Sequence, residues 1–360
     1  MILPRYLLRQ FFPPFFFGLA LFSGVLLMDK LFDIVDLLVN KGVSLSVSLR
    51  IFLYFLPTVL TLTVPMAVLL ACLLTFGRLS EENEITAMRA SGLSFTQILW
   101  PPLAIALVLC AVLAPFNTLV APRAINAFRS LYHEIVTTDP LIKIEPRQFI
   151  NLRDFRLYVD KAAPDRQSLQ DVQVYQITTD FWQRIYARRG FAKVETNRLF
   201  LRLEDGQLER APRGRSQDMM HMQFMEYTLS VPFGGPESSR DQSWREMTMT
   251  QLHTEIQTRK KLGVPAGPVR AEWNLRFAVA FSPLALAMLG IPLGITLQRG
   301  GRGVGFGASL AVVFAYYLLL ILGLNLAEKD TLPALPSLWM ANVFTMAVGV
   351  FLYRRRVLKS

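Results

Sequence analysis

Residues 77–92 read GRLSEENEITAMRASG, a charged and helix-prone stretch between two long apolar runs. The stretch is too polar to lie in the hydrocarbon of a bilayer, and its composition favours a helix over a simple turn. It therefore predicts a short helix near 78–92 that lies along a membrane face. Such a helix can offer side chains to a soluble partner that drives a membrane subunit.

Six runs of apolar residues approach or exceed the roughly 20 residues that a helix needs to cross a bilayer. They are residues 11–28, 51–76, 98–120, 277–297, 304–327 and 335–353. The chain is 52% hydrophobic and only 18% charged, against roughly 25% charged in soluble domains. No small-residue cleavage site follows the first run, so we expect it to stay in the mature protein. The sequence predicts an α-helical polytopic membrane protein with six transmembrane helices.

Positive charges in the short connections predict the orientation. Arg78 and Arg89 lie between the second and third runs, Arg299 and Arg302 lie between the fourth and fifth, and further arginines precede the first run and follow the last. Short cytoplasmic loops carry an excess of Lys and Arg, so these connections and both termini are expected in the cytoplasm. The long segment 123–270 then faces outward, into the periplasm of a cell with two membranes.

The segment 123–270 has the pattern of an inserted β-domain. Short apolar clusters with period-two alternation predict strands at 157–159, 172–175, 191–194, 199–203 and 227–231, and turn signals stand at 164–165, 205–206 and 234–236. A β-sandwich or jelly roll of about 100 residues with helical connectors fits this pattern. The predicted parts are helices 1–3 in 1–122, a β-jelly-roll-like domain in 123–270 and helices 4–6 in 271–360, with 266–276 as the return connector.

Signatures of catalysis are absent from the sequence. It has no phosphate-binding loop of the G-x-x-x-x-G-K-[ST] type, no H-E-x-x-H and no G-x-S-x-G, and its three histidines are scattered. Both cysteines lie inside apolar runs, so no disulfide or metal site is predicted. The net charge of +11 is divided between membrane-flanking cations and the external segment, and so indicates no nucleic-acid partner. We expect a non-catalytic protein without a cofactor.

Three stretches resemble the LptF/LptG permeases of lipopolysaccharide export. They are MILPRYLLR at 1–9, LSEENEITAMRASGLS at 79–94 and RAEWNLR at 270–276. The likeness covers the whole chain and is closer to the LptF branch. It implies the membrane subunit of an ABC transporter, paired with a homologous permease and a dimeric cytoplasmic ATPase. Such a complex takes lipopolysaccharide from the inner membrane and passes it to a periplasmic β-jelly-roll bridge toward the outer membrane.

The resemblance also implies roles for residues of the charged stretch. In that family the helix between the second and third spans docks in a groove of the ATPase, and the family's acidic residue matches Glu84. Glu81, Glu82 and Arg89 are further candidates for this ATPase coupling. Carboxylates at a helix start also complement the helix dipole without any partner, and this alternative stays open, above all for Glu81 and Glu82.

A second candidate site lies at the outer end of the first span. Asp29, Asp33 and Asp36 recur at helical spacing, and Lys30 lies three residues before Asp33. A lysine at this depth is costly unless it reaches the interface or a polar cavity. The resemblance implies that Lys30 contacts lipopolysaccharide phosphates at a gate between the first and fifth spans. Asp33 stands where a relative has arginine and is able to neutralise Lys30, so an ordinary interfacial helix end remains the alternative.

Lys41, Arg50 and Arg276 are expected near the same outer interface. Each is a candidate to bind a lipid phosphate, although cations there also anchor helix ends to headgroups.

Two other protein classes remain open. A mechanotransmitting ABC permease of the lipoprotein-release or cell-division type has a similar cytoplasmic segment, but its large external domain usually follows the first span. A membrane enzyme that acts on lipid or peptide would need a polar constellation within the spans, and the sequence shows none.

Overall fold

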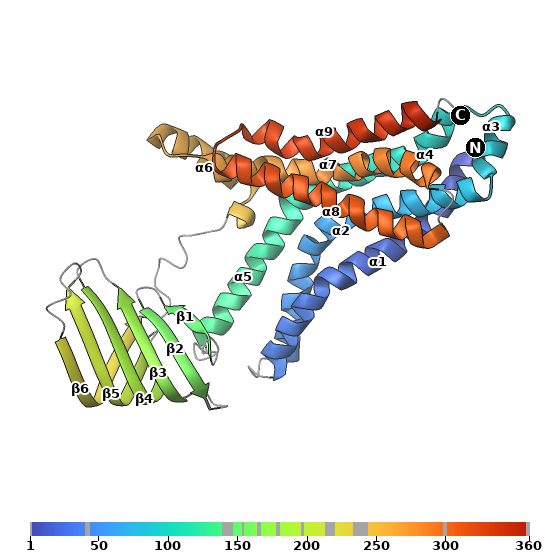
Figure 1. Cartoon of the computed structure of the whole chain (residues 1–360). Coiled ribbons are helices and arrows are strands. Elements are labelled where there is room, and N and C mark those ends of the chain that lie inside the picture. Colours follow the sequence, from blue (N-terminus) through green and yellow to red (C-terminus); the bar gives the residue numbers. More distant parts are fainter. Residues whose placement is uncertain are drawn as a thin grey trace. The chain divides into compact units, whose positions relative to one another are not determined.

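The computed structural model describes residues 2–39, 44–138, 147–152, 155–163, 167–177, 181–195, 198–212, 220–232, 244–297 and 301–357. The chain divides into two compact units (Figure 1). Met1–Ile34, Leu49–Ala127 and Ser243–Ser360 form the helical unit, and Val35–Ser48 with Phe128–Gln242 form the sheet unit.

The chain contains long helices interrupted by short helical turns. The helices are α1 (Ile2–Val39), α2 (Leu45–Glu81), α3 (Glu84–Ala90), α4 (Phe95–Pro115), α5 (Ala121–Thr138), α6 (Met249–Leu262), α7 (Gly267–Thr296), α8 (Gly301–Glu328) and α9 (Ala334–Leu352). The short turns are the π-helices η1 (Phe116–Val120) and η5 (Tyr353–Val357) and the 3-10 helix η3 (Trp244–Glu246). In the helical unit, α3 lies at the same end as the start of α1 and the end of α9, and α6 lies at the opposite end (Figure 1).

Within the described residues, six helices are long and apolar enough to cross a membrane. They are Leu3–Met28, Leu45–Glu81, Phe95–Leu131, Gly267–Thr296, Gly303–Glu328 and Ala334–Arg355. Together with the sheet unit, they confirm the predicted fold class of a helical polytopic membrane protein with an inserted β-domain. The predicted return connector at 266–276 is mostly the first turns of α7, because Pro268 near the start of α7 favours helix initiation there.

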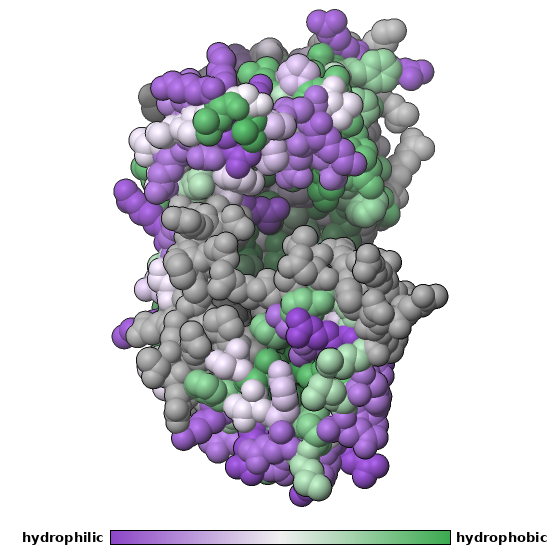
Figure 2. Space-filling view, turned by 90° about the vertical axis from the view of Figure 1, so that its left-hand side faces the viewer, coloured by the Kyte–Doolittle hydropathy of each residue, from purple (hydrophilic) through white to green (hydrophobic). Residues whose placement is uncertain are grey.

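Helix α7 is the central helix of the helical unit. It packs against α4, α8 and α9, and 72% of its most apolar window is buried, against 28% for α8. The exposed apolar side chains of α8 therefore suit lipid. Gly323 lets α8 approach α9 closely, since a Cβ at this position would collide with the carbonyl of Ser337. Figure 2 shows that hydrophilic residues gather on the surface over the α6 end of this unit, which agrees with the polar sequence of α6.

The sheet unit contains one antiparallel sheet in the described part of the chain. Its strands are β1 (Phe149–Leu152), β2 (Phe155–Ala162), β3 (Ser168–Ile177), β4 (Phe181–Glu195), β5 (Arg198–Pro212) and β6 (Met220–Pro232). All five predicted strand segments lie in β2 to β6. The strands neighbour one another in sequence order, so these six form a meander without the crossovers of a Greek-key jelly roll.

A row of residues that are left out of the strand pairing crosses five strands of the sheet, β2 to β6. The row consists of Asp160, Asp171, Arg188, Asp205 and Met225. Asp171 and Asp205 have positive φ angles of 51° and 55°. The strands keep the same pairing register on both sides of the row. Along a regular strand, residues that face the same side are two positions apart, but the buried residues Leu169 and Val172 of β3 are three positions apart. The row therefore reverses the alternation, and apolar side chains from both sides join one core.

The predicted turn at 205–206 is wrong, because both residues lie inside β5. An Asp-Gly pair is a common turn signal, but here Asp205 belongs to the unpaired row and Gly206 packs beneath an aromatic ring. A Cβ at Gly206 would collide with the ring of Phe224 and with the carbonyl of Tyr186. The other two turn signals, at 164–165 and 234–236, lie outside the described residues.

Candidate functional site

The charged stretch between the second and third spans forms a separate short helix with a break on each side. Helix α2 continues through Arg78 to Glu81, so the predicted helix near 78–92 is shorter than expected and begins at Glu84. Asn83 ends the helical path before α3, because its φ angle is 57°, a left-handed conformation that asparagine tolerates. Gly92 ends the helical path after α3, because its φ angle is 87°. Helix α3 is therefore a discrete element and not a frayed extension of α2.

The four predicted coupling residues lie in different surroundings. Glu81 is exposed at the end of α2, and Glu82 is exposed with its carboxylate 3.7 Å from the guanidinium of Arg78. Neither carboxylate lies at a helix start, so the dipole interpretation fits only Glu84, in the first turn of α3. Arg89, in the last turn, is exposed and forms no ion pair within the described residues.

Helix α3 is fastened to the start of α1 by one polar and one apolar contact. The hydroxyl of Tyr6 donates a hydrogen bond of 2.5 Å to Oε2 of Glu84. Ile85 is 5% exposed and packs in the same apolar cluster as Leu7 and Phe95. The opposite side of α3, including Thr86 and Arg89, is exposed. Sequence reasoning assigned no role to Tyr6, because 78 positions separate it from its partner.

The cation at the outer end of α1 lies against an aromatic ring. Lys30 is half-buried, with Nζ 5.7 Å from the ring centroid of Phe55 in α2. Arg50 is exposed in the first turns of α2. Lys41 and the side chain of Asp33 lie outside the described residues, so the predicted pairing of Asp33 with Lys30 stays a prediction.

Arg276 is a buried anchor at the start of the fourth span. Its side chain is 5% exposed, and Nε donates to Oε1 of Glu272 at 3.0 Å. Nη2 donates to the carbonyls of Trp244 and Arg245 at 3.1 and 3.2 Å. The carbonyl of Arg276 accepts a bond from Nδ2 of Asn117 at 3.2 Å. These bonds fasten η3 and η1 to α7, so the geometry favours a structural role over the expected contact with a lipid phosphate.

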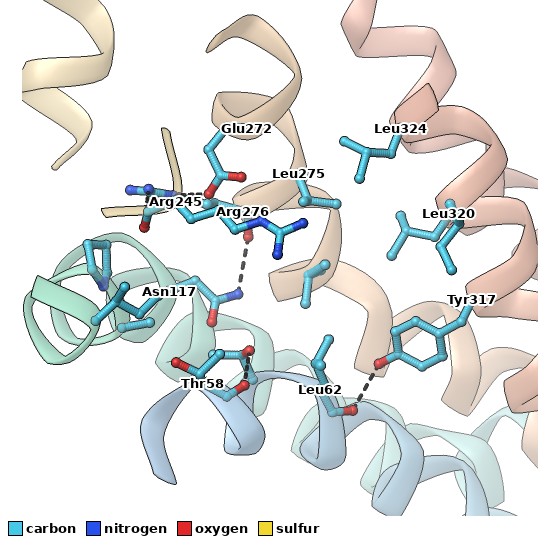
Figure 3. A pocket seen from close by; sticks show the side chains of 16 residues that line it. Thr58, Leu62, Asn117, Arg245, Glu272, Leu275, Arg276, Tyr317, Leu320 and Leu324 are labelled. Carbon is cyan, nitrogen blue, oxygen red and sulfur yellow. Dashed lines mark hydrogen bonds and ion pairs between the residues drawn. The ribbon is translucent and has the colours of Figure 1, made fainter. Parts of the chain in front are cut away.

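Next to this anchor lies a pocket of about 360 Å³ between α2, η1, α5, η3, α7 and α8 (Figure 3). Its lining includes Thr58, Asn117, Arg245, Leu275, Tyr317 and Leu320. The hydroxyl of Tyr317 donates to the carbonyl of Leu62 at 2.9 Å and so joins α8 to α2. Among the predicted site residues, Arg276 lines this pocket. Sequence reasoning did not single out Asn117, a lone amide near the end of an apolar run, or Arg245.

The described residues contain no metal-binding constellation. No group of three or more His, Cys, Asp or Glu side chains there could hold a metal ion. The helical unit contains two features of interest. One is the short helix α3, which is held against the start of α1, and the other is the pocket with polar side chains beside Arg276. This arrangement suits mechanical coupling and lipid contact.

Comparison with known proteins identifies a family over nearly the whole chain. The family model described as "Lipopolysaccharide export system permease LptF/LptG" matches residues 5–355. The chain is 22% identical to the lipopolysaccharide export system permease protein LptF of Escherichia coli strain K12, over 98% of this chain and 94% of that protein. The protein of the same description from Shigella flexneri matches with the same identity and coverage.

Proposed function

This chain belongs to the lipopolysaccharide export system permease LptF/LptG family, and from that premise we propose that it is a transmembrane subunit of an ABC transporter. The complex lifts lipopolysaccharide out of the inner membrane. The chain itself is non-catalytic and works with a homologous permease subunit and a cytoplasmic ATPase dimer that hydrolyses ATP. Its termini and α3 face the cytoplasm, and its sheet unit faces the periplasm.

The observation that carries this proposal is the way α3 is held. A helix that transmits force must be rigidly joined to the membrane helices and must keep a free side for its partner. The hydrogen bond from Tyr6 to Glu84 and the buried Ile85 provide the join. Exposed Thr86 and Arg89 provide the free side. Movement of a docked ATPase would therefore pass directly into α1, α2 and α4.

The sheet unit supports a role in passing the lipid onward. Strand β6 is the last strand of the sheet, and Met220, Met222 and Met225 on it are 55%, 52% and 89% exposed. An edge strand with unpaired backbone groups and flexible apolar side chains can add a strand from a neighbouring β-domain. We assign this edge to the periplasmic β-jelly-roll bridge protein.

Lys30 is our candidate for the entry of the lipid between α1 and α8. Its ammonium lies near the outer end of α1, where an anionic headgroup attracts a cation by about 1 kcal/mol. A photocrosslinker beside position 30 tests this role. We expect Lys30→Ala to reduce lipid crosslinking and Asp33→Ala to leave it equal or stronger, and unchanged crosslinking in Lys30→Ala would reduce this residue to an interfacial anchor.

The central test is Glu84→Ala in the assembled complex. We expect the variant to insert and fold but to lose ATPase co-purification or the export that ATP hydrolysis drives. Glu328→Ala is the matched control, since it removes one exposed carboxylate at the end of α8. Normal ATPase co-purification together with normal export in Glu84→Ala would refute the coupling role of α3.

A further inference from the structure

The pocket beside Arg276 contains polar atoms that the protein leaves without partners. Oδ1 of Asn117 and Oγ1 of Thr58 are buried and accept no hydrogen bond within the described residues. The guanidinium of Arg245 lines the same pocket and forms no ion pair or hydrogen bond there. Buried polar groups are normally satisfied, so unpaired acceptors in a cavity point to an occupant that carries donors.

Asn117 is held in place by its amide nitrogen, and its Oδ1 is left without a partner in the described residues. The residue is 5% exposed, and its Nδ2 donates a hydrogen bond of 3.2 Å to the carbonyl of Arg276. It lies in η1, a π-helical turn after Pro115, and such turns are frequent at functional sites. Figure 3 shows Asn117 and Thr58 on the same side of the pocket, across from Leu320 and Leu324.

The depth of the pocket matches the boundary between headgroups and acyl chains. Arg276 immediately precedes the apolar run 277–297 of α7, and Arg245 comes from the polar connector η3. Most of the remaining lining, including Leu275 and Leu320, is apolar. Glu272 also lines the pocket, and its carboxylate is paired with Arg276. A ligand seated here has a charged end at Arg245 and an apolar end that points toward the hydrocarbon.

The chemistry of the lining selects among lipid headgroups. Arg245 calls for an anion such as a phosphate, and Asn117 Oδ1 calls for an N–H or O–H donor. The hydroxyl of Thr58 can accept or donate. A choline headgroup carries no N–H, so it would leave Asn117 Oδ1 unpaired. An ethanolamine headgroup carries a phosphate and three N–H donors. A volume of about 360 Å³ suits one such headgroup with a few methylenes and is too small for an acylated disaccharide.

We propose that this pocket binds the headgroup of a membrane phospholipid of the phosphatidylethanolamine type. The phosphate pairs with Arg245, the ammonium donates to Asn117 Oδ1 and Thr58 Oγ1, and the first methylenes lie along Leu275 and Leu320. The site is separate from Lys30 and from the transported lipid. It requires only that the chain spans a membrane, so it stands whether or not the coupling role of α3 is correct.

Lipid retention by the purified full-length protein tests the proposal. The protein is equilibrated in mixed micelles that contain equal amounts of phosphatidylethanolamine and phosphatidylcholine, and the retained lipids are quantified by mass spectrometry. We expect selective retention of phosphatidylethanolamine. Loss of a charge-assisted contact in Arg245→Ala should weaken it about tenfold. Thr58→Val, which keeps the shape of the side chain, should weaken it about threefold.

The control is Arg270→Ala, which removes an exposed cation of α7 outside the pocket and should leave retention unchanged. O-phosphoethanolamine without acyl chains should fail to displace the lipid, and displacement at equal concentration would assign the pocket to a soluble compound instead. The proposal would be overturned by equal retention of both phospholipids or by unchanged retention in Arg245→Ala. It would also be overturned if, with lipopolysaccharide added to the micelles, the protein retained lipopolysaccharide alone.

Discussion

The hydrogen bond between Tyr6 and Glu84 predicts a measurable link between α1 and α3, the helix that we propose couples to an ATPase. Tyr6→Phe removes only the hydroxyl that donates to Oε2 of Glu84 at 2.5 Å. A hydrogen bond to a charged group contributes about 1.5–3 kcal/mol when it is shielded. Both side chains are half-buried, so solvent screening reduces the expected loss to about 1 kcal/mol. This corresponds to roughly a fivefold weaker hold of α3 on α1.

The assay is the affinity of the purified permease for the proposed ATPase partner, with export per ATP hydrolysed as the second readout. We expect Tyr6→Phe to weaken affinity by up to fivefold and to lower export per ATP. Glu84→Gln keeps an acceptor for Tyr6 but loses the charge. In the double variant the two losses should be less than additive, because both act on one bond.

The reasoning fails if the two losses add fully, since Tyr6 would then act independently of Glu84. It also fails if Tyr6→Phe binds the ATPase more tightly, which would mean that the hydroxyl competes with the partner for the carboxylate. Thermal unfolding of Tyr6→Phe close to that of the unaltered protein separates these outcomes from a general loss of folding.

Three further predictions concern the two units. Arg276→Met leaves Glu272, whose side chain is 12% exposed, as an uncompensated carboxylate, so thermal unfolding should show a loss of about 3 kcal/mol, the low end for a buried pair, that the added change Glu272→Gln largely restores. Gly206→Ala should destabilise the sheet unit by about 1–3 kcal/mol, seen as faster proteolysis there, because its Cβ meets an aromatic ring and a carbonyl. The hydrogen bond to Asp171 raises the pKa of Tyr186 above 10.0, so this contact stabilises the fold fully below pH 10 and is lost as pH rises through the raised pKa. Difference absorbance against Tyr186→Phe should show this late titration, and Asp171→Asn should bring it earlier.

Local patterns in the sequence were enough to predict the broad architecture. Apolar length alone identifies a membrane-spanning helix, since a bilayer leaves the backbone no other partners. Period-two alternation likewise predicted β2 to β6, because neighbouring side chains of a strand face opposite sides. The ends of individual helices were harder to predict from the sequence. Nothing between 76 and 81 stops α2, so the predicted start of the short helix moved from 78 to Glu84.

The misplaced turn at 205–206 has a different cause. Asp-Gly favours a turn by local conformation, but β4 and β6 flank β5 on both sides and pair with it along its length. These hydrogen bonds outweigh the local preference for a turn. Asp205, with its positive φ angle, becomes part of the row that reverses the alternation of buried and exposed side chains. Only the neighbouring strands decide between the two outcomes.

The sequence by itself determined six spans, a strand-rich insert and a charged short helix, because each depends on residues that are near one another along the chain. Tertiary structure alone decided that Glu84 meets Tyr6, that Arg276 is a buried anchor and that Asn117 and Arg245 line one pocket. These contacts join residues that are far apart in the chain. Their existence depends on how the helices pack, since packing sets which side chains are buried and which polar atoms are left for a ligand.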